Sequence, residues 1–198
     1  MLSTGAVPEA SPTDLLLLFQ RAQAQFTDRV DAVGPGEWDT PALPGWSVAD
    51  LVAHLAHQQL RVPALLAGQQ PDAIPGDTDE LLDGDPLTAW ETAADAALTA
   101  WAAPGALSRT VQLPSGATPA VDLLVELTAD LTVHAWDLAA AVRGVTALDP
   151  ELVAAALAFA EEQLGDEGVP GVVDPPVAVP PGADPQTRLL ARFGRRVR

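Results

Sequence analysis

The stretch from residue 119 to residue 143 has the strongest helical periodicity in the chain, and a histidine interrupts its apolar face. At about 100° per residue, four leucines fall within about 60° of one another and His134 lies within about 60° of their centre; they are Leu124, Leu127, Leu131 and Leu138. A helix with one apolar face must pack that face against other elements. Burying an imidazole there without a polar partner is costly, so this helix needs a partner for His134.

Helical periodicity, capping residues and helix-ending Gly or Pro predict several further helices. The expected ranges are 13–33 with Thr13 as the N-cap, 48–66 with Ser47 as the N-cap, 86–103, 150–164, and a short helix at 184–193. Residues 109–116 alternate briefly and then turn, which indicates a short extended segment or small hairpin. Residues 37–46 are expected to be a loop, as are residues 68–85, which are rich in Pro, Gly and Asp.

These elements predict an all-α protein in which the long helices form a bundle. A chain of 198 residues suits one domain with a full core. We expect residues 1–165 to form the helical bundle. Residues 166–198 are expected to be an irregular, proline-rich C-terminal extension with one short helix, packed on the same domain.

Composition excludes several classes of function. The formal net charge is −17, and Lys and Arg together number 10, which argues against binding to nucleic acid or to anionic membranes. No apolar run reaches the roughly 18 residues of a membrane span, and the N-terminus does not have the pattern of a secretory signal. A cytoplasmic location is therefore expected. Cysteine is absent, so a thiol that takes part in chemistry would have to arrive on a small molecule.

Three residues form a candidate metal site. Asp130 and His134 are four residues apart, which places them on one face of a helix. In the helix at 48–66, His54 lies about 110° from the centre of the apolar face, at a margin that can reach a neighbouring helix, whereas His57 lies about 170° away and should face solvent. We therefore predict His54, Asp130 and His134 as ligands of a divalent metal, with Asp137 as an outer partner that orients an imidazole.

A simpler interpretation remains open for the same residues. A buried histidine is commonly hydrogen-bonded, and an Asp–His pair at helical spacing is commonly an ion pair without metal. In that case Asp130 would only neutralise His134 within a structural bundle. Trp38 and Trp46 are interpreted as packing residues of the loop that precedes the second helix.

Two segments resemble a known family. Trp38 with residues 43–55 (LPGWSVADLVAHL), and residues 130–139 (DLTVHAWDLA), resemble the two motifs of the actinobacterial mycothiol-dependent maleylpyruvate isomerase-like proteins. The tail, at residues 177–180 and 188–195, is similar to that of one subgroup. The resemblance implies a DinB-like four-helix bundle in which His54, Asp130 and His134 complete a zinc site. Asp130 stands where the family has glutamate, and only about thirty residues follow Gly165, where the characterised isomerase has a longer C-terminal domain.

The resemblance also implies a function. The leading hypothesis is a zinc-dependent enzyme that uses mycothiol in transfer or isomerisation of a small electrophilic substrate, with open metal positions that take the thiol. Its expected partners are thus a small-molecule thiol and an electrophile, without nucleic acid or membrane. Arg61, Arg109 and Arg143 are candidates for binding substrate carboxylates. The alternative is a non-catalytic metal-binding bundle that serves as a sensor, a store or a partner-binding module.

Overall fold

The computed structural model describes residues 11–69, 85–169 and 173–197, and this part of the chain is mostly helical. The helices are α1 (Pro12–Asp31), α2 (Val48–Leu66), α3 (Pro86–Trp101), α4 (Ala120–Ala141), α5 (Pro150–Gln163) and α6 (Pro185–Arg192), with a short 3₁₀ turn, η3 (Ala106–Ser108). The strands are β1 (Pro41–Leu43), β2 (Trp46–Ser47), β3 (Thr110–Leu113) and β4 (Gly116–Pro119). The predicted loop at 68–85 lies largely outside the described residues.

Polar side chains set the starts of the first two helices. At α2, Ser47 accepts a hydrogen bond from the backbone N–H of Asp50, and Asp50 accepts one from the backbone N–H of Ser47, as predicted. At α1 the same reciprocal pair joins Ser11 and Asp14. The prediction of Thr13 as the N-cap was wrong, because Ser11 is followed by a proline at the first helical position and by the carboxylate that completes the pair.

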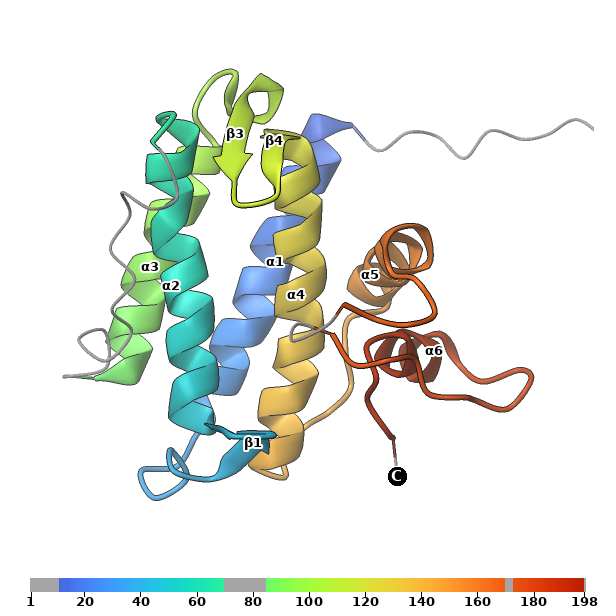
Figure 1. Ribbon diagram of the computed structural model, residues 1–198. Coiled ribbons are helices and arrows are strands. Elements are labelled where there is room, and N and C mark those ends of the chain that lie inside the picture. The colour runs from blue at the N-terminus through green and yellow to red at the C-terminus, as the bar shows by residue number, and fades with distance from the viewer. Residues whose placement is uncertain (1–10, 70–84, 170–172, 198) are drawn as a thin grey trace, which may run out of the picture.

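Four long helices, α1 to α4, lie side by side in Figure 1, with α2 packed on α3 and α4, and α1 packed on α3 and α4. The β3–β4 hairpin covers one end of this group, and β1–β2 lies at the opposite end. Because α2 starts at the β1–β2 end and α4 starts at the hairpin end, these two helices run antiparallel. Within the described residues, no helix combines the length and apolarity that a membrane crossing requires.

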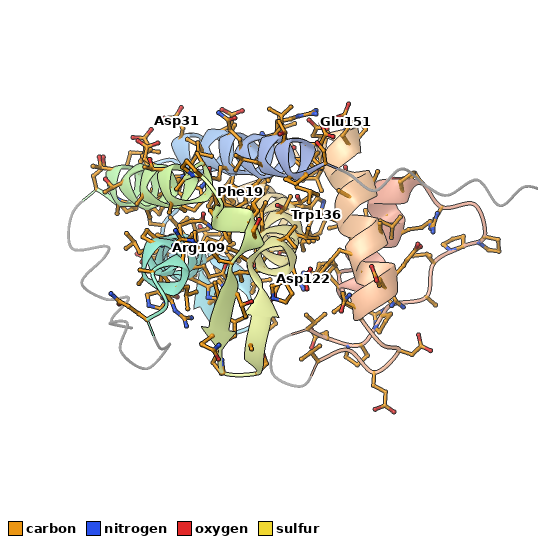
Figure 2. The ribbon with its side chains drawn as sticks, turned by 90° about the horizontal axis from the view of Figure 1, so that it is seen from above. Phe19, Asp31, Arg109, Asp122, Trp136 and Glu151 are labelled. Carbon is orange, nitrogen blue, oxygen red and sulfur yellow. The ribbon has the colours of Figure 1, made fainter. Side chains whose placement is uncertain are left out.

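Aromatic side chains fill much of the core between these helices. Phe19 of α1 meets Trp101 edge to face at 6.3 Å, and Phe26 meets Trp90 in the same way at 4.6 Å. In Figure 2 Phe19 points into the space between the helices, whereas Asp31 and Glu151 point outward. Offset contacts of this kind stabilise the core beyond the area they bury.

The two small antiparallel hairpins differ in how well they were predicted. The β3–β4 pair, with Val111 opposite Thr118, confirms the expected hairpin, and Gly116, which follows the two-residue turn, has a φ of 120°. The β1–β2 pair was interpreted as loop, and this was wrong. Its strands have three and two residues and a register shift, so no alternating pattern could indicate them.

The C-terminal helices pack on the side of α4 away from α2 (Figure 1). The short helix α6 falls inside the range predicted for it, and its Leu189 and Leu190 are fully buried. The chain after α6 then returns toward α4, where Arg195 contacts Asp137.

The buried indole of Trp90 generates a stability prediction. Its Nε1–H donates to the Thr27 hydroxyl at 2.7 Å. Thr27→Val leaves this N–H without an acceptor in the core, which should lower the free energy of unfolding by about 1–3 kcal/mol. Urea denaturation followed by tryptophan fluorescence measures the change. The matched control is Thr92→Val, whose exposed hydroxyl bonds only its own helix backbone, and a loss as large in the control would contradict the argument.

Candidate metal centre

The antiparallel packing of α2 and α4 brings the three predicted ligands to one place. His54 lies about two turns after the start of α2, and His134 about two turns before the end of α4, so both lie toward the β1–β2 end of the structure. One donor atom from each of His54, Asp130 and His134 lies within 4.8 Å of the others. The structure thus brings together all three predicted residues.

Within this cluster, the two residues of α4 are already in contact. Oδ1 of Asp130 lies 3.3 Å from Nε2 of His134, as the four-residue spacing predicts. The rings of His54 and His134 meet edge to face with their centroids 6.0 Å apart. The side chain of His134 is 10% exposed and that of Asp130 is 27% exposed, so the cluster is largely shielded from water.

The second ring nitrogen of His134 is held by Asp137, the residue predicted to orient it. Nδ1 of His134 lies 2.9 Å from Oδ2 of Asp137. Because an ionised carboxylate can only accept, Nδ1 carries the proton and donates it to this bond. The tautomer is thereby set, and Nε2 of His134 faces Asp130 and His54 with its lone pair available in the neutral ring.

Gln58 is a site residue that sequence reasoning missed. Its Nε2 lies 3.0 Å from Nε2 of His54, one turn earlier on α2. Two buried oxygens here have no hydrogen-bond partner, Oδ2 of Asp130 and Oε1 of Gln58. The orphaned carboxylate oxygen of Asp130 beside converging imidazoles is one that a cation would satisfy, so the donor set fits a divalent metal. The spacing of Gln58 from His54 was the available signal, but glutamine is too common on helices to be selected by it.

The pKa values of the two histidines in the cluster are shifted in opposite directions. Burial alone would lower the pKa of His134, but the Asp130 charge and the hydrogen bonds with Asp130 and Asp137 raise it to about 9. Burial would likewise raise the pKa of Asp130, but the His134 charge and hydrogen bond lower it to about 2. The pKa of His54 is lowered, mainly by burial. In the metal-free protein, His134 and Asp130 therefore form an ion pair beside a neutral His54.

Other predicted neighbours lie around the cluster in different ways. Trp46, at 36% exposure, packs its ring edge to face on His54 with the centroids 4.9 Å apart, so it covers the site in addition to anchoring β2. His57 does not belong to the converging set, as predicted. It was expected to face solvent; its side chain is partly exposed, and it lowers the pKa of His54.

The arginine that contacts the site was not among the three candidates for substrate binding. Arg195 donates to both carboxylate oxygens of Asp137. Of the three candidates, Arg109 donates to the backbone oxygen of Leu66, and Arg143 is exposed at the end of α4. Arg195 follows α6, far from the motif residues in sequence, so no spacing could point to it.

Fold and site together define a class: a mostly helical protein with a candidate three-ligand metal centre between two antiparallel helices. Residues 19–139 match the family model of the mycothiol maleylpyruvate isomerase N-terminal domain, and the chain belongs to this family. The matched range includes all three candidate ligands and Asp137, but it ends before α5, α6 and Arg195.

Two similar proteins come from Mycobacterium tuberculosis. They are the uncharacterized protein MT0763 of strain CDC 1551 and the uncharacterized protein Rv0738 of strain H37Rv. Each is 34% identical over 190 residues, which cover 93% of this chain and 100% of the relative. The similarity therefore extends past the family-matched region into the C-terminal segment. No solved structure gives a significant match.

The ion pair on α4 predicts a titration in the metal-free protein. The pKa of His134 in the folded state lies above the ordinary value of 6.5, so the pair stabilises the fold fully below about pH 6.5 and this contribution is lost as the pH rises through about 9. Nuclear magnetic resonance of the imidazole C–H protons should show this late titration. Asp130→Asn should move it downward, and a His134 that titrates near 6.5 in both proteins would contradict the assignment.

Proposed function

We propose that His54, Asp130 and His134 hold one divalent metal ion, with zinc as the expected metal, in a DinB-like four-helix bundle formed by α1 to α4. The convergence of the three donor atoms within 4.8 Å supports this most directly. Two imidazole nitrogens and one carboxylate oxygen form a donor set typical of catalytic zinc sites. In this proposal residues 1–165 form the metal-binding bundle, and residues 166–198 are an extension of the same domain.

We further propose that the protein is a mycothiol-dependent transferase or isomerase acting on a small electrophilic substrate in the cytoplasm. A bound divalent cation would supply the Lewis acidity that lowers the pKa of a coordinated thiol toward neutrality. Three protein donors leave a position for such a thiol. The chain contains no cysteine, so the sulfur must come from another molecule, and membership in the mycothiol maleylpyruvate isomerase family supports mycothiol as its source.

The protein's own residues would serve this chemistry by positioning and by exclusion of water. Asp137 holds the proton on Nδ1 of His134, which keeps Nε2 directed at the centre. Trp46 packs on His54 and limits access of water from the β1–β2 end. The 27% exposure of the Asp130 side chain supports this side as the approach for small molecules.

A second candidate function is supported by Gln58. The amide of Gln58 lies beside His54, with Nε2 3.0 Å from Nε2 of the ring, and its Oε1 is buried without a partner. A flip of this amide would exchange the two atoms and turn Oε1 toward His54. If this amide oxygen supplied a fourth ligand, the protein would fill all four positions and the site would be a non-catalytic metal module. Addition of thiol to the metal-loaded protein distinguishes the two functions, because only an open position can take a sulfur ligand.

Metal binding itself is tested by stoichiometry. We expect purified protein to bind about one zinc ion per chain, and His54→Ala to weaken zinc binding more than about 100-fold, since even outer partners of a ligand contribute 10–100-fold. Competition with a chromophoric chelator measures the affinity. The matched control is His57→Ala, which removes an imidazole from the same helix but not from the converging set. Equal losses in the two variants, or no bound metal in the wild type, would contradict the site.

Thiol dependence tests the proposed activity. We expect zinc-loaded protein to turn over a small electrophile such as maleylpyruvate only when mycothiol is added, and His134→Ala to abolish turnover because the centre loses a ligand. Product formation is followed by absorbance with mycothiol, with glutathione, and without thiol. Turnover that is indifferent to every added thiol would rule out this function, and binding of zinc without any turnover would favour the non-catalytic module.

A further inference from the structure

We propose that Arg195, in the segment that follows α6, is a positioning residue of the metal centre and acts on it through Asp137. The proposal rests on the metal site proposed above. It assigns to the C-terminal segment a role in metal binding, although this segment lies outside the family-matched residues 19–139.

Arg195 binds the carboxylate of Asp137 through two hydrogen bonds. Nε of Arg195 lies 3.2 Å from Oδ1 of Asp137, and Nη2 lies 2.8 Å from Oδ2. The side chain of Asp137 is only 2% exposed and that of Arg195 is 16% exposed, so water screens this pair weakly. Two parallel N–H donors fix the plane of a carboxylate as well as its charge.

The same carboxylate holds the imidazole of His134. Oδ2 of Asp137 accepts from both Nη2 of Arg195 and Nδ1 of His134, at 2.8 Å and 2.9 Å. Arg195, Asp137 and His134 thus form a continuous chain of hydrogen bonds that ends at the ring whose Nε2 faces the centre. If Arg195 is removed, Asp137 keeps its place on α4 but loses the contact that sets the orientation of its carboxylate.

The segment around Arg195 is built to hold this side chain in place. The backbone N–H of Arg195 donates to the backbone oxygen of Leu190, and its side-chain Nη1 donates to the backbone oxygen of Phe193. Gly194 has a φ of 78°, and a Cβ at this position would lie 2.5 Å from the Cβ of Asp174. The close turn therefore requires glycine, and it directs the next residue toward α4.

A purely structural role is the alternative for the same contact. Arg195 could only compensate the buried charge of Asp137, and its loss would then lower stability without a specific effect on metal binding. A double-mutant cycle separates the two roles. If Arg195 acts through Asp137, the loss of metal affinity caused by Arg195→Gln disappears in the Asp137→Asn background, whereas independent effects add.

The experiment measures zinc affinity by chelator competition in wild type, Arg195→Gln, Asp137→Asn and the double variant. We expect Arg195→Gln to weaken zinc binding about tenfold, as is typical of outer partners, and to have no further effect when Asp137 is already asparagine. The absorption bands of the cobalt-substituted proteins report the ligand geometry, and they should change in Arg195→Gln.

The matched control is Arg192→Gln, from the same segment. Arg192 donates to the backbone oxygens of Ala160 and Leu164 and so anchors α6 without touching Asp137. It should lower the melting temperature but leave zinc affinity and the cobalt spectrum unchanged. If Arg195→Gln does not fold, Arg195→Lys replaces it in the cycle, since lysine keeps the charge but not the two parallel donors.

The possible results of the zinc-affinity measurements lead to different conclusions. Wild-type protein that binds no zinc overturns the proposed metal centre, and the role of Arg195 with it. Wild-type protein that binds zinc, with unchanged affinity in the Arg195 variant, overturns only the role of Arg195. A loss that is equally large with and without Asp137 shows that Arg195 does not act through this carboxylate, which also overturns the proposal.

Discussion

The burial of His134 in the apolar face of α4 is the constraint on which the rest of the site depends. An imidazole among leucines must find polar partners, and the helix supplies them at the two spacings that reach it, Asp130 four residues before and Asp137 three residues after. Both contacts form within α4, and packing of the leucines turns this face of the helix inward. The same orientation directs Nε2 of His134 toward α2, where His54 lies. The orientation of α4 and the geometry of the candidate metal centre are therefore both linked to the side chain of His134.

Local rules predicted the helices and the three converging residues well, because the relevant information lies within single turns. The apolar spacing of α2 predicted both its bounds and the different directions of His54 and His57. The spacing of Asp130, His134 and Asp137 predicted both contacts of the ring. Periodicity placed His54 at a margin that can reach a neighbouring helix, and the resemblance to a family implied the same three residues as one site.

The features that sequence reasoning missed depend on contacts between distant segments or on very short elements. Arg195 contacts Asp137, which lies 58 residues earlier in the chain. It is one of ten Lys and Arg residues, and no spacing pattern distinguishes it from the others. The strands β1 and β2 are too short to alternate, yet their pairing places Trp46 on His54. In both cases, tertiary structure adds a partner to a residue that the sequence had already marked.

The hydrogen-bond network around the candidate metal centre is asymmetric, and this bears on Asp130, which the resemblance places where the family has glutamate. On α4, His134 is held at both nitrogens, and Asp137 is held in turn by Arg195. On α2, His54 contacts the amide of Gln58 and the rings of Trp46 and His134, and in the described residues its ring is hydrogen-bonded to no carboxylate. In the proposed site, an aspartate ligand would be one methylene shorter than a glutamate ligand and would hold the ion nearer to α4, so any adjustment would come from the α2 side. His54, the less constrained of the candidate ligands, would make this adjustment, because rotation of its side chain breaks few contacts. In the proposed metal site, the residues of α4 would therefore fix the position of the ion, and His54 would complete its coordination.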